Sequence, residues 1–181
     1  HVRVLRVHTR MPVMDAEHID AAMIAALRHP RLTTYIVLHT NHLRELSEQA
    51  KKACARIVDA GIPTLSQTVL LRGVNDHAET LEALFRELVV LRVKPYYLHH
   101  GDLAVGTGHF RTSLAEGQTI MRQLRKRLSG IAQPTYVLDI PGGFGKVPAG
   151  PNYVGLEDTN GQREVEDPWG RRHEYPPVRG E

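Results

Sequence analysis

A glycine-rich segment near residue 140 holds the residue types most able to carry chemistry in this chain. It reads Asp139-Ile-Pro-Gly-Gly-Phe-Gly-Lys146. Glycines let backbone amides approach an anion closely, and the amine of Lys146 follows them at once. The segment is not a P-loop, because its spacing differs and no Ser or Thr follows the lysine. A lysine so placed can form a Schiff base with a phosphate-bearing aldehyde cofactor. On spacing alone, a glycine-rich turn with an exposed lysine is the alternative.

Two carboxylates and several histidines follow predicted strands. Asp102 and Asp139 end neighbouring strands, so they could hold an ammonium or share acid–base work. They could equally be helix caps or loop residues. The histidines could suggest a metal, but no predicted helix carries a His-x-x-x-His pair and no thiolate lies near, so we predict no metal ligand. These histidines are His39, His42, His99, His100 and His109.

The elements that position these residues alternate between strand and helix at a spacing of about 30 residues, the length of a βα unit. Such an alternation predicts a parallel sheet with right-handed crossovers. In such folds the functional groups gather at the carboxyl ends of the strands. The predicted strands are 2–7, 33–39, 64–71, 94–98 and 135–140, and the predicted helices are 16–28, 48–60, 77–92 and 114–128.

Helix boundaries carry recognisable capping residues. Polar side chains that accept from the first turn are preferred at N-caps, and a glycine commonly ends a helix in the left-handed conformation. We therefore predict N-caps and capping boxes at Asp15, at Ser47, at Asp76 with Glu79, and at Ser113 with Glu116, and a stop at Gly61.

Composition limits the class of protein. The chain has 181 residues, 41% of them hydrophobic and 24% charged, which is typical of a soluble globular domain. No apolar run is long enough for a membrane span. The net charge of +3 is dispersed, so we predict no nucleic-acid partner. We expect the densest basic cluster, Arg122, Arg125, Lys126 and Arg127, to be a solvated helix face.

Two further features concern location and organisation. The single cysteine, Cys54, lies in an apolar helical pattern, which predicts a buried core residue and a cytoplasmic location. Beyond Pro148 the chain is rich in proline, glycine and charge, with no periodicity. We therefore predict one ordered domain over residues 1–150 and an extended, irregular tail over residues 151–181.

Four motifs lie at or near the predicted strand ends: QTVLLRGVND from Gln67, KPYYLHHGD from Lys94, HFRT from His109, and PTYVLDIPGGFGKVP from Pro134. Together they resemble the lysine 2,3-aminomutase family, which belongs to the radical S-adenosylmethionine enzymes. The resemblance extends from Val2 to about Tyr153.

The resemblance implies a fold and a reaction. The fold is an α/β, partial (βα)6-type barrel of about strands 3 to 6 plus a following strand. The reaction moves the amino group of free lysine between adjacent carbons. A [4Fe-4S] cluster cleaves S-adenosylmethionine to a deoxyadenosyl radical, and pyridoxal phosphate carries the nitrogen as an aldimine. The implied partners are the small-molecule substrate lysine and other copies of the chain in a homo-oligomer.

Site residues transfer position by position. Lys146 is implied to hold pyridoxal phosphate, and Asp102 and Asp139 to hold the ε-ammonium of lysine. Gln67 and His39 are implied to lie near S-adenosylmethionine. His99 stands where some relatives have a tyrosine that stacks on the cofactor, and it could stack there too.

The chain also departs from the family pattern. The three-cysteine cluster motif and the first barrel strands are absent from this sequence. We therefore expect a truncated chain that is inactive alone and belongs to a complete isomerase. Two alternatives remain open at this point. One is a relative that modifies a lysine of elongation factor P, and the other is a non-catalytic remnant or binding module.

Overall fold

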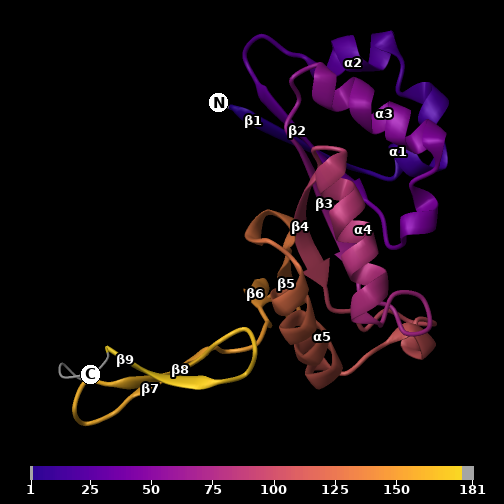
Figure 1. Ribbon diagram of the computed structural model, residues 1–181. Coiled ribbons are helices and arrows are strands. Elements are labelled where there is room, and N and C mark those ends of the chain that lie inside the picture. The colour runs from indigo at the N-terminus through magenta and orange to yellow at the C-terminus, as the bar shows by residue number, and fades with distance from the viewer. Residues whose placement is uncertain (1, 177–181) are drawn as a thin grey trace.

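The computed structural model describes residues 2–176 and has an α/β architecture with two sheets (Figure 1). The main sheet has six strands in the order β1-β2-β3-β4-β5-β6, and a smaller sheet has the order β7-β8-β9. The main strands are β1 (Val4–Thr9), β2 (Thr33–His39), β3 (Thr64–Val69), β4 (Lys94–His99), β5 (Thr135–Asp139) and β6 (Lys146–Pro148). The helices are α1 (Met11–Met14), α2 (Ala21–Leu27), α3 (Glu48–Asp59), α4 (Ala78–Val90) and α5 (Leu114–Arg127).

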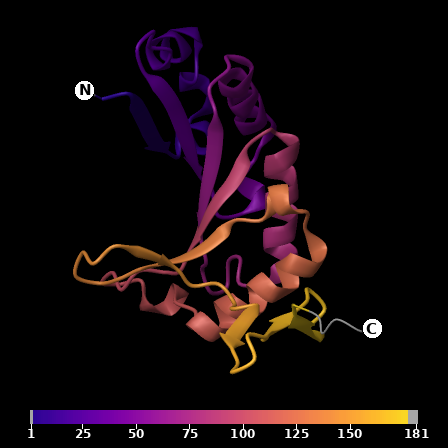
Figure 2. The same ribbon diagram turned by 90° about the vertical axis from the view of Figure 1, so that its left-hand side faces the viewer.

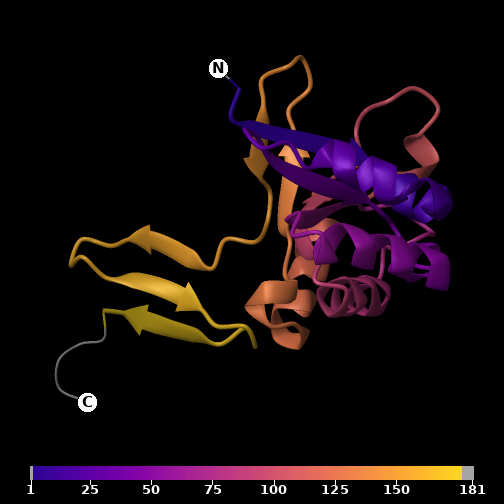
Figure 3. The same cartoon turned by 90° about the horizontal axis from the view of Figure 1, so that it is seen from above.

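The first five strands of the main sheet are parallel, and β6 pairs antiparallel with β5. The sheet curls, and its helices lie along one side of it (Figures 2 and 3). This confirms the predicted α/β class with a parallel sheet. The numbering of these strands within a six-stranded barrel stays a prediction. Over residues 2–176, no helix combines the length and the apolar character that a membrane crossing requires.

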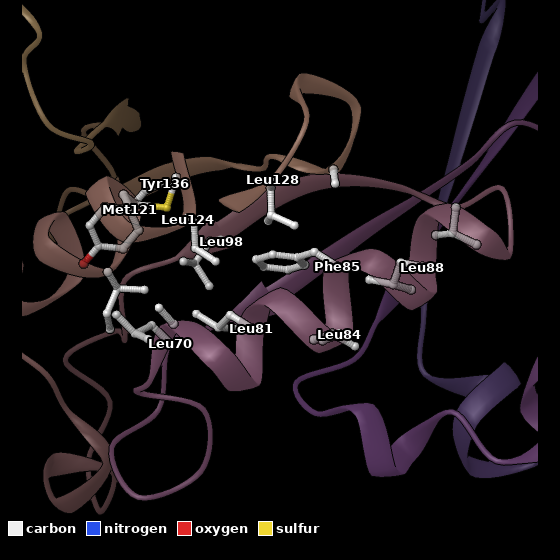
Figure 4. Packing of buried hydrophobic residues seen from close by; sticks show 14 of the residues in the cluster. Leu70, Leu81, Leu84, Phe85, Leu88, Leu98, Met121, Leu124, Leu128 and Tyr136 are labelled. Carbon is white, nitrogen blue, oxygen red and sulfur yellow. The ribbon is translucent and has the colours of Figure 1, made fainter. Parts of the chain in front are cut away.

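The main core lies between the strands and the helices α4 and α5 (Figure 4). Helix α4 places apolar residues three and four positions apart, so they form one stripe that faces the sheet. This stripe is Leu81, Leu84, Phe85 and Leu88, each with no exposed surface. Burying one such side chain stabilises the fold by about 1.5–3 kcal/mol. Cys54 is 1% exposed and belongs to this core, as predicted.

A glycine brings α5 close to β5. A Cβ atom at Gly117 would lie 2.1 Å from the hydroxyl oxygen of Tyr136, so only glycine fits there without a shift. The Tyr136 ring is buried, and its hydroxyl lies 2.7 Å from Nδ1 of His100. Burial raises the pKa of Tyr136 to about 12.

Two of the predicted caps form and two do not. Ser47 accepts from Ala50 N, and Ser113 with Glu116 makes a complete capping box. The prediction for Asp15 is wrong, because a 3₁₀ turn follows it and Asp20 instead caps α2 by accepting from Met23 N. The prediction for Asp76 is also wrong. The N-cap of α4 is His77, one residue later, and it makes no side-chain cap. The predicted stop at Gly61 is confirmed by its φ of 77°.

The tail forms a sheet, which corrects the prediction of an irregular segment. Strands β7 (Val154–Glu157), β8 (Arg163–Glu166) and β9 (Arg172–Tyr175) pair antiparallel and extend away from the helices (Figure 3). Short strands with few apolar residues gave no alternating pattern. The division of the chain at residue 150 stays a prediction.

The small sheet is joined to α5 by basic residues. Arg122 donates to both carboxylate oxygens of Glu166 at 3.0 and 3.2 Å. Arg122 and Arg125 also lie 5.7 and 5.8 Å from the Tyr153 ring centroid. Arg127 pairs with Glu79 of α4 at 2.6 Å. The basic residues of α5 therefore include structural contacts as well as a solvated face.

Candidate active site

Strand alternation directs the polar residues away from the core. Successive side chains of a strand point to opposite faces. Leu38 and Leu98 point into the helix-covered core, so His39 and His99, which follow them, lie on the opposite, concave face. The same alternation places Asp139 on that face, because Tyr136 belongs to the core and lies three residues earlier.

The glycine-rich segment forms a hairpin that returns Lys146 to Asp139. These two residues are direct partners in the antiparallel pairing of β5 with β6. The hairpin closes through a bond from Ile140 N to Gly145 O of 2.8 Å. Its glycines adopt positive φ values of 90°, 81° and 96° at Gly142, Gly143 and Gly145, which L residues rarely adopt.

Three of the predicted site residues meet in one cluster. Lys146 Nζ donates to Asp139 Oδ2 in a short ion pair. It also lies 3.2 Å from His99 Nδ1, and that nitrogen lies 3.2 Å from Asp139 Oδ2. The Lys146 side chain is 30% exposed and the Asp139 side chain 40%, so ligands from solvent can reach both. The cluster joins a primary amine, a carboxylate and an imidazole.

Tyr97 completes this cluster, and sequence reasoning did not single it out. The pairing of β3 with β4 shifts register there, so Tyr96 and Tyr97 lie side by side with ring centroids 3.8 Å apart. Lys146 Nζ is 5.7 Å from the Tyr97 ring centroid, within cation–π range. His99 meets the same ring edge-on at 5.6 Å. Its position two residues before His99 was the available signal, since i and i+2 share a face.

The charges of the cluster shift two pKa values. The Lys146 ammonium, by donating to Asp139, holds the pKa of that carboxyl below its usual range. Burial lowers the pKa of His99, and the Lys146 charge lowers it further, against Asp139 and Asp102, which raise it. His99 is therefore neutral near pH 7 while Asp139 is ionised.

A second polar group lies along the same face toward β1. His39 Nε2 is 3.3 Å from His8 Nδ1, and Gln67 is the direct neighbour of His39 in the pairing of β2 with β3. Burial lowers the pKa of His39, and His8 and His99 lower it further through their charge. His8 was missed from the sequence, although its position in β1 opposite Val37 places it on this face.

The remaining predicted residues lie outside the cluster. Asp102 occupies the exposed loop after β4 and raises the pKa values of His99 and His100 through its charge. Its convergence with Asp139 stays a prediction. His42 caps a 3₁₀ turn by accepting from Arg44 N, and His100 bonds to Tyr136. His109 stacks on Phe110 at 4.0 Å.

Comparison with known proteins finds similarity to several lysine 2,3-aminomutases. A family profile described as lysine-2,3-aminomutase matches residues 121–161. The L-lysine 2,3-aminomutase of Acetoanaerobium sticklandii is 43% identical over 162 residues, covering 88% of this chain and 38% of that protein. The putative L-lysine 2,3-aminomutase of Aquifex aeolicus is 46% identical over 154 residues, covering 85% of this chain and 42% of that protein.

The fold has a counterpart among solved structures. A radical SAM methyltransferase from Sphaerobacter thermophilus superimposes with a TM-score of 0.51 at 24% identity. The superposition covers 80% of this chain and 44% of that one. This likeness concerns the fold alone. The chain spans about two fifths of the length of the curated relatives it matches.

Proposed function

The chain belongs to the lysine 2,3-aminomutase family, and on that premise we propose that it supplies the cofactor-lysine and ammonium-binding part of a lysine aminomutase. The complete protein moves the amino group of lysine between adjacent carbons. The observation that carries the proposal is the cluster of Lys146, Asp139 and His99 on the concave face of the sheet. A primary amine beside a carboxylate and a neutral imidazole suits both amine binding and capture of an aldehyde.

The residues present fit pyridoxal phosphate. Lys146 offers a reachable amine at the end of the glycine hairpin, and a Cβ atom at Gly143 or Gly145 would meet nothing within 4 Å, which leaves room beside the backbone. Tyr97 offers a ring face next to that amine, and His99 meets the amine with its Nδ1. When bound, pyridoxal phosphate supplies the carbonyl that binds the migrating nitrogen and delocalises electrons during its transfer. We assign Lys146 to hold the cofactor and His99 to orient it.

The protein's own groups then bind and orient the substrate. Asp139, and Asp102 from the loop after β4, are proposed to hold the ε-ammonium of lysine by charge-assisted hydrogen bonds. Gln67 and His39, adjacent on the same face, are proposed to contact S-adenosylmethionine. The two carboxylates, Asp102 and Asp139, favour an ammonium-bearing substrate, and the ε-ammonium is common to free and protein-bound lysine.

An iron–sulfur cluster does not fit the cysteine of this chain. Cluster ligation requires thiolates. Cys54 is 1% exposed, and burial raises its pKa to about 11, so it stays a thiol at neutral pH. The residues of this chain therefore provide no cluster ligand, and the source of the radical lies outside the roles assigned to them.

Borohydride trapping tests the proposal. The purified protein is incubated with pyridoxal phosphate, reduced with sodium borohydride and digested, and the modified peptide is identified by mass spectrometry. We expect the pyridoxyl group on Lys146, and its loss in Lys146→Arg. Lys94 is the matched control, because it is also partly buried at a strand of the same sheet. Label shared evenly among Lys94, Lys126 and Lys146 would refute the assignment.

A further inference from the structure

Lys146 fills an ammonium-binding arrangement that the chain itself provides. An alkylammonium only donates hydrogen bonds, and carboxylates, imidazole lone pairs and aromatic faces are the groups that hold it. Lys146 Nζ contacts one of each: Asp139 Oδ2, His99 Nδ1 at 3.2 Å and the Tyr97 ring at 5.7 Å from its centroid. We propose that these three residues form a primary-ammonium site, that Lys146 occupies it in the free chain, and that a ligand amine enters only after Lys146 has left.

The position of His99 supports a site for one positive charge. Its Nδ1 lies 3.2 Å from a group that can only donate, Lys146, and 3.2 Å from a group that can only accept, Asp139. When Nδ1 accepts from Lys146, the imidazole proton must sit on Nε2. Nε2 is buried and has no hydrogen-bond partner among residues 2–176. Without Lys146, the Nδ1 lone pair and Asp139 Oδ2 would face each other unless a cation replaced the ammonium or the imidazole carried a proton on Nδ1.

The arrangement links cofactor capture to amine binding. This part rests on the proposed function, in which the Lys146 amine is taken up by an aldehyde cofactor. Once that amine is engaged there, it no longer donates to Asp139, and the carboxylate becomes free for the ammonium of a ligand. Coupling of this kind is reciprocal and typically amounts to 5–150-fold in affinity. Lysine would therefore bind after the cofactor, not before it.

A proton competes for the same place. The charged groups that face His99 are Lys146 on β6, Asp139 on β5, His39 on β2 and Asp102 in the loop after β4. Removing the Lys146 charge takes away one of the groups that lowers the pKa of His99, so that pKa should rise. A protonated His99 donates to Asp139 and closes the site. Ammonium affinity should then weaken as the pH falls.

Binding of n-butylammonium tests the proposal, because this probe has an ammonium but no carboxylate. Its affinity is measured by calorimetry at pH 8 for the full chain and three variants. We expect Lys146→Met to bind it about tenfold more tightly than the unmodified chain. Lys146→Arg keeps the positive charge, so the ammonium site should stay occupied and the affinity for n-butylammonium should stay as low as in the unmodified chain. Lys51→Met, which removes a cation from the surface of α3, should change nothing. Equal affinities for Lys146→Met and the unmodified chain would overturn the proposal.

The pH arm adds a second readout in the same variant. In Lys146→Met, affinity for n-butylammonium should fall between pH 8 and pH 5 as His99 takes up a proton, and His99→Phe in that background should flatten the profile. If the affinity of Lys146→Met for n-butylammonium did not depend on pH, the shared site would be contradicted. If His99 had only a structural role, adding His99→Phe to Lys146→Met would leave the pH profile unchanged.

A measurement without any variant covers the case in which Lys146→Met does not fold. Nitrogen-15 NMR of the unmodified chain reports which ring nitrogen of His99 carries the proton. We expect a bare Nδ1 and a protonated Nε2 at pH 8, and a protonated Nδ1 would overturn the proposal. Neither arm needs pyridoxal phosphate or turnover. Label on Lys146 with unchanged butylammonium binding would therefore refute this inference alone and leave the proposed function standing.

Discussion

The two faces of the main sheet are built from alternate residues of the same strands, yet they differ in polarity and in exposure at the carboxyl ends of those strands. On the helix-covered face, Leu98 and Phe85 have no exposed surface and contact other apolar residues. On the concave face, His99 and Asp139 meet Lys146, and their side chains are 13%, 40% and 30% exposed. One face is closed by the chain's own helices. The other is left open to bind.

This contrast teaches where stability and function reside. Apolar burial is the dominant favourable term in folding. Half-exposed ion pairs contribute little, about 0–1 kcal/mol. Changes on the helix-covered face should therefore cost stability, and changes on the concave face should cost binding. The following predictions try to break that separation.

The largest effect is expected from the core. Phe85→Ala removes a fully buried ring and leaves a cavity, so the free energy of unfolding should fall by about 3–5 kcal/mol. Gln67→Ala on the concave face is the control and should change it by less than about 1 kcal/mol. Urea unfolding followed by circular dichroism measures both. A loss of equal size in the two variants would show that the concave face also holds the fold together.

The next effect is expected on the open face. On the proposed function, Asp139→Asn in the complete protein removes a charged acceptor from the substrate ammonium, so lysine turnover should fall about 30-fold, equivalent to about 2 kcal/mol. The stability should change by less than about 1 kcal/mol, because the Asp139 pair with Lys146 is partly exposed.

Asp59→Asn is the matched control for that variant, since Asp59 also forms an ion pair, with Arg92 on the surface. It should leave turnover unchanged. Unaltered lysine kinetics in Asp139→Asn would show that this carboxylate does not hold the substrate.

A smaller effect is expected where the two layers touch. Gly117→Ala forces a methyl group against the buried Tyr136 ring and strains its contact with His100. Overpacking costs about 1–3 kcal/mol, while alanine gains up to about 1 kcal/mol of helix propensity, so we expect a net loss of about 1–2 kcal/mol. Gly130→Ala, which has open space around it, should be neutral within about 0.5 kcal/mol. A stabilised Gly117→Ala would mean that α5 shifts freely on the sheet.

Much of the helix-covered face could be predicted from the sequence. Apolar stripes at helical spacing and β-branched runs gave the five parallel strands and the helices between them. Ser47 and Ser113 were predictable because a cap depends on residues only three positions apart. Asp15 failed because Asp20, five residues later, satisfies the same rule and the intervening residues form a 3₁₀ turn. A local sequence pattern cannot decide which of two nearby aspartates becomes the N-cap.

The concave face was only partly predictable. Lys146 and Asp139 were chosen from one motif, but their direct contact depends on the β5–β6 hairpin, which no periodicity revealed. The role of Tyr97 depends on a register shift in β4, and that of His8 on packing between β1 and β2. The contact of the small sheet with α5 depends on Arg122 and Glu166, 44 positions apart. Strand pairing, its register and contacts between distant residues leave no mark in the periodicity of a short window of sequence.

The smallest predicted effect compares two consecutive histidines on opposite faces. Burial lowers the pKa of both His99 and His100, from an unfolded value near 6.5. Below that value the unfolded chain binds more protons than the folded one, so stability should be constant above about pH 7.5 and fall as the pH drops below about 6.5. At His99 the Lys146 charge adds to the effect of burial while Asp139 and Asp102 oppose it, and at His100 Arg111 adds to it while Asp102 opposes it.

His100→Gln should flatten the acid loss of stability more than His99→Gln does, because a protonated His99 can donate to the Asp139 carboxylate whereas the partner of His100 is the neutral Tyr136 hydroxyl. Gln at position 100 keeps a hydrogen bond within reach of Tyr136 but takes up no proton. Urea midpoints at pH 7.5 and pH 5.5 measure the difference for each variant, with His109→Gln in the exposed loop as the control. A larger flattening in His99→Gln would show that more of the acid loss of stability arises on the concave face. The separation between a stabilising face and a binding face would then fail at two consecutive residues on opposite faces.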